Sequence, residues 1–431
     1  MSLTGITNLQ LWDLCRKVSP NFKSHTSKGT SDLFTEKGFE ALKVSDLGAL
    51  NEFFEISLRV AFQKLTTSRA RNIFEGKGFL EVYDTPNGGY VQRMAVDSIK
   101  PVTPAFKGLE DGESVDPFII RKPKAAERFF AQNFDFQSFI TIQDFQVKQI
   151  FVAEFGMAEF LAGVMQGLQN GYTIQESVNV KEALNDAINS TDYPLQSTQV
   201  LGVTWDFTAE PTDAMLTGYI LAIKDLVTSI TTIEQSSAYN AGKFSTVVDP
   251  SDLVMIARAG IKNRIQLGLE VGAFNPDRLT IPVDDIIEVQ DFGGCTPYIL
   301  DQSNNHVTLQ PIYDKNGEQV AYVDASVTVN GYATFNGTKW VVNVTSGSTT
   351  ADTNQTFVDS ELDGWDDPNA NVLAVIAQKG LVFENRQNPY EVRPIYNPRG
   401  LYQNYWASSP NNAIVVDPYY SMVVIQGEQT T

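Results

Sequence analysis

The residue types that do most enzyme chemistry are scarce in this 431-residue chain. It holds two histidines, His25 and His306, and two cysteines, Cys15 and Cys295, all far apart in the sequence. Such scattered residues lack the short spacings of a zinc site, and two histidines leave few candidates for a general base. We therefore expect no catalytic residues, no metal and no cofactor. The cysteines are expected to be free, partly buried thiols, as in proteins made in a reducing cytoplasm.

Two short runs resemble fragments of ligand-binding loops. The run EGKG at Glu75–Gly78 lacks the third glycine of a phosphate-binding loop, so it predicts a turn. Asp363, Asp366 and Asp367 lie close together, but the spacing and the final glutamate of a calcium loop are missing. This acidic cluster therefore predicts a solvated turn.

A third run has the composition of a contact surface. Pro398 and Gly400 are typical of a tight turn, and Arg399 between them is expected to point outward. Arginine, tyrosine and tryptophan dominate the hot spots of protein interfaces. The run predicts either a turn packed on core aromatics or an inter-subunit contact. Its candidate contact residues are Asn397, Pro398, Arg399, Gly400, Tyr402, Tyr405 and Trp406.

Charge is distributed unevenly along the chain. The net charge is −19, of which residues 1–150 carry +1 and residues 151–431 carry −20. A protein that binds nucleic acid tightly would be basic overall. The pattern predicts either an ordinary solvated acidic surface or an acidic outer face with a near-neutral face turned towards a partner. A second set of candidate inter-subunit contacts is the basic cluster of Arg121, Lys122, Lys124 and Arg128.

The elements that must position these residues begin with an arm, a helix and a long β-rich segment. Residues 1–45 have a mixed composition that is typical of an arm, and apolar spacing predicts a helix over 46–71. Residues 76–140 combine turn signals with short β-like runs. These runs are 79–83, 90–99 and 114–121. The segment forms either a projecting β-hairpin or an ordinary antiparallel sheet.

Helical and alternating patterns follow. Apolar residues recur on one face over Val147–Leu168, which predicts a long spine helix at about 145–170. Residues 200–295 alternate between strand-like and helical runs, which is typical of an α/β domain. Strands are expected at 200–207, 244–248 and 281–289, and a helix over 213–230. A second helix is expected after Asp249, which can cap it, with Pro250 in the first helical position.

Residues 296–371 change composition again. They are rich in Asn, Thr, Gly, Ser and Asp and carry a net charge of −8. Strands are predicted at 307–313, 319–329 and 339–344, with turns at Asn316-Gly317, Asn330-Gly331 and Asn336-Gly337. We expect a small all-β insertion, after which apolar strands return at 372–377 and 381–384.

The block Asn397-Pro398-Arg399-Gly400-Leu401-Tyr402, with Asn404-Tyr405, closely resembles the C-terminal region of major capsid proteins of phi-29-like podoviruses. The order of predicted elements is also similar to that of Hong Kong 97-type capsid subunits. The resemblance implies an α+β fold with an N-terminal arm, an extended β-hairpin loop, a spine helix in a peripheral domain and an α/β axial domain. The insertion is larger than this family leads us to expect.

Carried over by position, the resemblance implies eight segments. They are an N-terminal arm (1–45), a helix leading into the loop (46–75), the extended loop (76–140), the peripheral domain with the spine helix (141–199), the axial domain (200–295), the β-rich insertion (296–371), the axial return with the Asn-Pro-Arg-Gly segment (372–412) and a C-terminal strand of the peripheral domain (413–431).

The resemblance also implies a function. The chain would be the major head protein, assembling as pentamers and hexamers into an icosahedral or prolate shell around double-stranded DNA. Implied partners are further copies, a scaffolding protein, a portal protein and packaged DNA bound without sequence specificity. Implied locations are the virion and, during assembly, the host cytoplasm. No apolar run approaches the roughly 20 residues of a membrane helix, so no membrane partner is expected.

A second function, also that of a phage structural protein, stays open at this point. Another phage structural protein, such as a tail or head-fibre component, would account for the β-rich insertion. It would not account for the long spine helix.

Overall fold

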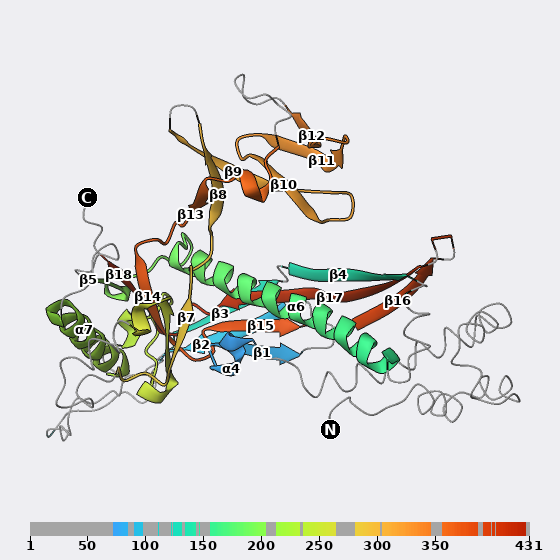
Figure 1. Cartoon of the computed structure of the whole chain (residues 1–431). Coiled ribbons are helices and arrows are strands. Elements are labelled where there is room, and N and C mark those ends of the chain that lie inside the picture. Colours follow the sequence, from blue (N-terminus) through green and yellow to red (C-terminus); the bar gives the residue numbers. More distant parts are fainter. Residues whose placement is uncertain are drawn as a thin grey trace, which may run out of the picture.

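The computed structural model describes residues 72–84, 90–97, 124–131, 134–143, 156–203, 213–232, 236–263, 281–301, 304–345, 356–386, 391–397, 399–400 and 402–427, and the single residues 111, 122 and 146. They form a long sheet crossed by one long helix, an α/β unit at one end of that sheet and a separate β-rich unit (Figure 1). The expected arm at 1–45 and helix over 46–71 lie outside the described residues and remain predictions.

The long sheet is organised by β17 (Tyr402–Val416), a strand of 15 residues. Along one side it pairs with β4 (Phe134–Gln143). On the other side its first half pairs with β16 (Glu391–Asn397) and its second half with β15 (Val382–Arg386). These three pairings are antiparallel, whereas β1 (Leu80–Asp84) adds to β15 in parallel. One strand thus fixes the position of three others.

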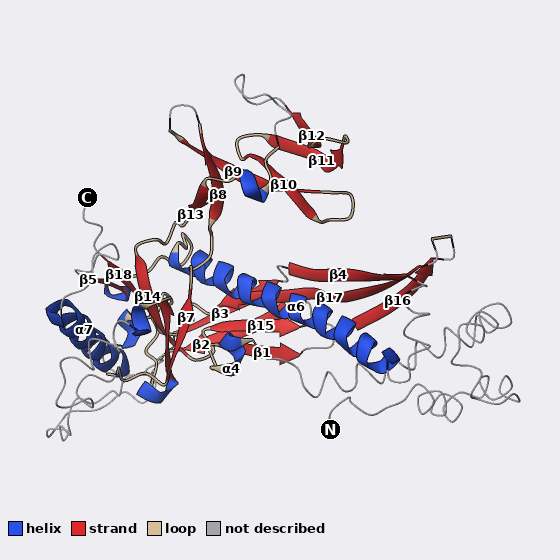
Figure 2. Ribbon diagram, viewed as in Figure 1, coloured by secondary structure: helices blue, strands red, loops and turns tan. Residues whose placement is uncertain are grey.

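One helix, α6 (Gly156–Ile188), lies across one face of the long sheet (Figure 2). The sequence pattern predicts an end near residue 170, whereas α6 continues to Ile188. Its buried residues recur every three or four positions: Leu161, Ala162, Met165, Leu168, Tyr172, Glu176, Val180 and Leu184. The apolar pattern misses the second half because a glutamate occupies one of these core positions.

A mixed five-stranded sheet forms the α/β unit, in the order β5-β18-β14-β6-β7. The strands are β5 (Val200–Val203), β18 (Met422–Gly427), β14 (Val372–Gln378), β6 (Leu253–Arg258) and β7 (Asp285–Val289). One face packs on α7 (Asp213–Thr231), and the other packs on Val180 and Leu184 at the end of α6. The end of α6 therefore joins the two sheets.

The α/β pattern is confirmed, but two expected elements are wrong. Residues 244–248 form no strand, and the segment after Asp249 is not a helix. It makes one 3-10 turn, Pro250–Asp252, and enters β6. Asp249 does cap that turn, because its side chain accepts a hydrogen bond from the Ser251 amide at 2.9 Å. The first five residues of β6 are buried, and burial on both faces of a sheet outweighs the local helix-start signal.

The C-terminal segment 413–431 contains two strands in two sheets, so the expected single strand is wrong. Its first part is the end of β17 in the long sheet, and β18 lies between β14 and β5 in the α/β sheet. The turn between them contains Pro418, which cannot donate to a strand ladder. Asp417 fixes this turn by accepting a hydrogen bond from the Tyr419 amide at 3.0 Å.

The segment 76–140 combines the two alternatives that the sequence left open. β1 and β4 belong to the long sheet. Between them, β2 (Tyr90–Val96) and β3 (Ala125–Ala131) pair antiparallel as a separate two-stranded sheet, which we call the ribbon. The separate hairpin is therefore shorter than 76–140. The strand expected at 114–121 lies outside the described residues.

The insertion is β-rich, as predicted. It contains β8 (Thr296–Leu300), β9 (His306–Tyr313), β10 (Gln319–Asp324), β11 (Thr328–Phe335), β12 (Trp340–Thr345) and β13 (Gly364–Asp366). The turns at Asn316-Gly317 and Asn336-Gly337 are confirmed. Asn330-Gly331 is instead a bulge inside β11, and the chain turns earlier, between β10 and β11. An Asn-Gly pair predicts positive φ, which a bulge requires as well as a turn.

Candidate assembly surfaces

The ribbon is held against the long sheet through Arg93 on β2. The guanidinium carbon of Arg93 lies 4.7 Å from the ring centroid of Phe383 and 5.3 Å from that of Tyr83. Its Nε lies 3.6 Å from Oδ2 of the buried Asp417. On β3, Phe130 contacts the same Phe383 ring edge to face, with centroids 4.9 Å apart. One face of the ribbon is thereby packed against its own subunit.

The opposite face of the ribbon is exposed and carries apolar side chains beside the polar pair Gln92 and Glu127. Met94, Val96 and Phe129 are 68%, 53% and 61% exposed. Val96 lies directly opposite Ala125 in the antiparallel pairing, which extends the apolar surface across both strands. Exposed apolar patches of this kind often mark protein interaction sites.

The basic cluster is divided between two environments. Lys124 donates to the carbonyl oxygen of Lys243 at 2.5 Å and lies 4.2 Å from the ring centroid of Phe244. Arg128 stacks over the Tyr193 ring at 4.5 Å. Both residues thus hold the ribbon to its own chain. Lys122 is exposed, and Arg121 lies outside the described residues, so an inter-subunit role for the cluster stays a prediction.

The Asn-Pro-Arg-Gly run forms the turn between β16 and β17, at the far end of the long sheet (Figure 1). The side-chain oxygen of Asn397 accepts from the amides of Arg399 and Gly400 at 3.0 and 3.2 Å. Its amide nitrogen donates to the Tyr402 hydroxyl at 2.8 Å. Arg399 is exposed, as predicted. A Cβ on Gly400 would overlap the Tyr402 ring, so the turn requires glycine there. Pro398 lies outside the described residues.

The two aromatic residues that follow the turn face opposite sides of the sheet. Tyr405 is 1% exposed on the α6 side, and burial raises its pKa. It is a core residue of its own subunit, so the predicted contact role of Tyr405 is wrong. Trp406 faces the other side and stacks on Phe139, with centroids 4.6 Å apart and planes 26° apart. Phe139 is 40% exposed, so the contact role of Trp406 stays a prediction.

Asn397→Ala should lower the thermal midpoint of unfolding, because the turn loses its three side-chain hydrogen bonds. We expect a loss of about 1–2 kcal/mol, since each partly exposed bond contributes on the order of 0.5–1.5 kcal/mol. Asn397→Asp is the matched control, because it keeps the acceptor oxygen and loses only the donor to Tyr402. Calorimetry that ranks Asn397→Asp as the less stable of the two variants would contradict this account of the turn.

A buried ionic network that the sequence did not reveal joins α6 to the long sheet. Arg386 donates from Nε and Nη2 to the two oxygens of Glu384, both at 2.9 Å, and also pairs with Glu176 on α6. The Tyr172 hydroxyl donates to Glu384 at 3.0 Å, and burial raises the pKa of Tyr172. The side chains of Arg386, Glu176 and Glu384 are at most 7% exposed. The network fixes the sheet against the helix.

The residues that resemble fragments of ligand-binding loops, and the described cysteine, have structural roles. Of the turn predicted at Glu75–Gly78, the first two residues belong to the short helix α4 (Ile73–Gly76), and only Lys77 and Gly78 form a turn. The three aspartates of the acidic cluster do not converge. Asp363 accepts from the Leu300 amide at 2.6 Å, Asp366 faces His306 at 3.2 Å, and Asp367 pairs with Arg258 at 2.9 Å. Cys295 is a free thiol, as expected, and burial raises its pKa to about 11.

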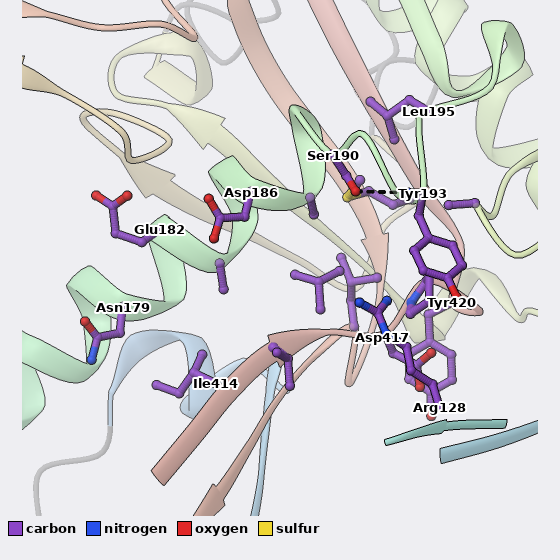
Figure 3. A pocket seen from close by; sticks show the side chains of 18 of the residues that line it. Arg128, Asn179, Glu182, Asp186, Ser190, Tyr193, Leu195, Ile414, Asp417 and Tyr420 are labelled. Carbon is purple, nitrogen blue, oxygen red and sulfur yellow. Dashed lines mark hydrogen bonds between the residues drawn. The ribbon is translucent and has the colours of Figure 1, made fainter. Parts of the chain in front are cut away.

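A cavity of about 360 Å³ lies between the second half of α6, the end of β17 and the ribbon (Figure 3). Its apolar lining includes Leu195, Leu381 and Ile414, and its charged lining includes Arg128, Asp186 and Asp417. The lining residues include no histidine or cysteine.

Across the part of the chain that the structure describes, no group of three or more His, Cys, Asp or Glu residues could hold a metal ion. No helix in that part is long and apolar enough to cross a membrane.

Solved structures of phage heads share this arrangement. The capsid of Staphylococcus phage Andhra matches with a TM-score of 0.52 and 15% identity, covering 83% of this chain and 85% of that one. The structure of head fibre and inner core protein of native bacteriophage P68 matches with a TM-score of 0.50 and 12% identity, covering 84% and 86%. No curated protein sequence matches the chain. The fold is thus the Hong Kong 97-type fold of phage capsid subunits.

The family follows from the sequence itself. The family model described as "Phi29-like phage major capsid protein" matches residues 14–425, which is nearly the whole chain. The chain belongs to this family. It is a major capsid protein, a structural component of the virion and not an enzyme, and it assembles into a multimeric shell.

Proposed function

We propose that the long sheet with α6 is the peripheral domain of this capsid subunit and that the α/β unit is its axial domain. Copies form pentamers and hexamers that close into an icosahedral or prolate shell around double-stranded DNA. Supporting observations are the strand order of the two sheets and the length of α6, which suits a spine helix. Assembly takes place in the host cytoplasm with a scaffolding protein and a portal protein. The DNA is enclosed without sequence recognition, in keeping with the net charge of −19.

The exposed face of the ribbon is the proposed contact with the next copy. The carrying observation is that Met94, Val96 and Phe129 remain exposed on a strand pair whose other face is already packed. A patch on one copy that meets a different patch on the next makes a heterologous contact, and heterologous contacts form rings when the rotation between copies closes. Lys122 and Arg399 are further candidates at this interface, because both are exposed. Variants with charged residues on this face test the contact, and we expect them to form no shells.

The insertion is proposed to face the outside of the shell. Its net charge of −8 would be repelled by packed polyanionic DNA on the inside. Its own small core contains Ile312, Ala321, Val323 and Val342, so it can fold with few contacts to the rest of the subunit.

Removal of the insertion should leave assembly intact. Pro297 and Trp365 lie directly opposite each other in the β8–β13 pairing, so an Asn-Gly hairpin turn can join them and replace residues 298–364. The variant keeps the Arg258–Asp367 ion pair at the root of the insertion. Electron microscopy should show shells as in the parent. Antibodies against the insertion should bind intact parent shells, and a failure to bind would contradict the outward placement.

A further inference from the structure

The long sheet has one edge that is unusually open to pairing. β4 is a strand of ten residues, and in the described part of the chain it pairs only with β17. Along its middle, from Gln137 to Thr141, its other edge carries a row of backbone N–H and C=O groups; at its end the Gln143 amide donates to the side chain of Gln146 at 3.1 Å. The register with β17 is continuous from Phe136 to Gln143, so this stretch is regular and unbulged. Such an edge is a template for another strand.

The other edges of this sheet carry the usual protection against pairing, and β4 does not. β16 contains Arg393 and Pro394, and β1 is five residues long with Glu81 and Asp84. The sequence of β4 is FDFQSFITIQ, which has no lysine, arginine, proline or glycine, and a single charge near its start. Charged residues and proline normally block edge pairing. Their absence from the longest edge of the sheet needs an explanation.

We propose that β4 pairs antiparallel with β4 of a second copy, about a two-fold axis at Phe139. The proposal rests on the proposed function, because it assigns one contact between copies of the shell subunit. In this register Phe139 lies opposite the partner's Phe139, and Gln137 lies opposite the partner's Thr141. A two-fold axis makes the contact isologous, so the same patch serves both copies.

The register of the proposed β4–β4 pair is chosen by two requirements: the buried side chains must stay on one face of the sheet, and like charges must not lie opposite each other. Strands must pair so that buried side chains stay on one face, and Phe136 and Ile142 are buried on the α6 side. A centre at Phe139 keeps them there and places no two like charges opposite each other. It also joins the exposed Phe139 rings across the axis. With the stacked Trp406 of each copy, they make a continuous row of four aromatic rings.

Disulfide cross-linking tests the pairing directly. Residues directly opposite in an antiparallel pair have Cα atoms about 4.5–5.5 Å apart, within the range that a disulfide spans. In a chain with Cys15→Ser and Cys295→Ser, Phe139→Cys should give a covalent dimer on a non-reducing gel after mild oxidation. Ile395→Cys is the matched control. It is 56% exposed on the same face of the sheet but lies on β16, and should give at least tenfold less dimer.

A charge series keeps the proposal testable if oxidation disturbs the chain. Phe139→Lys places two lysines opposite each other and should weaken assembly. Gln137→Lys with Thr141→Glu creates two opposite-charge pairs across the axis and should assemble like the parent. Equal dimer yields from Phe139→Cys and Ile395→Cys, or unaffected assembly of Phe139→Lys, would overturn the pairing. The yield of cross-linked dimer is measured both on assembled particles and on the soluble, unassembled chain. A parent that makes no shells therefore contradicts the proposed function, while the dimer yield still decides the pairing.

Discussion

Phe129→Glu combined with Val96→Glu should abolish shell formation and leave the subunit folded. Both side chains are more than half exposed in the single chain, at 61% and 53%, so their replacement costs the subunit little. Exposed substitutions usually change the free energy of unfolding by less than about 0.5 kcal/mol. In the shell the same face would be covered, and each unpaired carboxylate there would cost several kcal/mol in desolvation. Repetition at every contact makes the effect all or none.

The choice of residues and the control follow from the strand register. Met94 is avoided because it lies opposite Glu127, and a second carboxylate there would repel it within the subunit. The control pair is Tyr313→Glu with Tyr332→Glu on the insertion, where the side chains are 50% and 59% exposed. Sedimentation and electron microscopy should show shells for the control only. If the ribbon variant forms shells in the parent yield, the ribbon face is not an inter-subunit contact.

Arg386→Met should lower the free energy of unfolding by about 3–5 kcal/mol, because removing one partner leaves buried charge uncompensated. Glu384 and Glu176 both pair with Arg386, and all three side chains are buried. Urea unfolding of the unassembled subunit measures the change. Arg399→Met at the exposed turn is the control, and we expect it to change the free energy of unfolding by less than about 0.5 kcal/mol.

A triple variant separates the loss of the network from the loss of packing. Replacing Arg386, Glu384 and Glu176 together with apolar residues removes every charge of the network. Such exchanges are often close to neutral. The triple variant should therefore be more stable than Arg386→Met alone. If it is less stable, the network is not a source of uncompensated charge and its side chains act through packing.

The sequence predicted the parts of the fold in which local pattern and burial agree. α7 and the insertion strands β9 and β12 follow their periodicity and turn residues closely, whereas the strand predicted at 319–329 is divided between β10 and β11. The prediction failed where tertiary burial overrides a local signal. Asp249 and Pro250 begin a helix-like turn, yet the next residues form β6, an inner strand of the α/β sheet. A glutamate at a core position of α6 likewise hid the second half of that helix.

Among the candidate site residues, too, local signals were predictable and long-range contacts were not. The turn after Asn397 and the exposure of Arg399 were predictable, because proline and glycine spacing is a local signal. The buried position of Tyr405 was not, since facing direction depends on the pairing of β17. Arg93 and Arg386 were missed because their partners lie far away in the sequence. The one available signal was the charged pair Glu384 and Arg386 directly after the apolar run Leu381-Val382-Phe383.

The central claim is that identical copies of this chain close into a shell. Electron microscopy of the chain, produced in a bacterial cytoplasm with its scaffolding protein, tests it most directly. The account predicts closed shells of uniform curvature, whose subunits carry the insertion on the outer surface. Fibres, or monodisperse monomers that persist at high concentration with the scaffolding protein present, would contradict it.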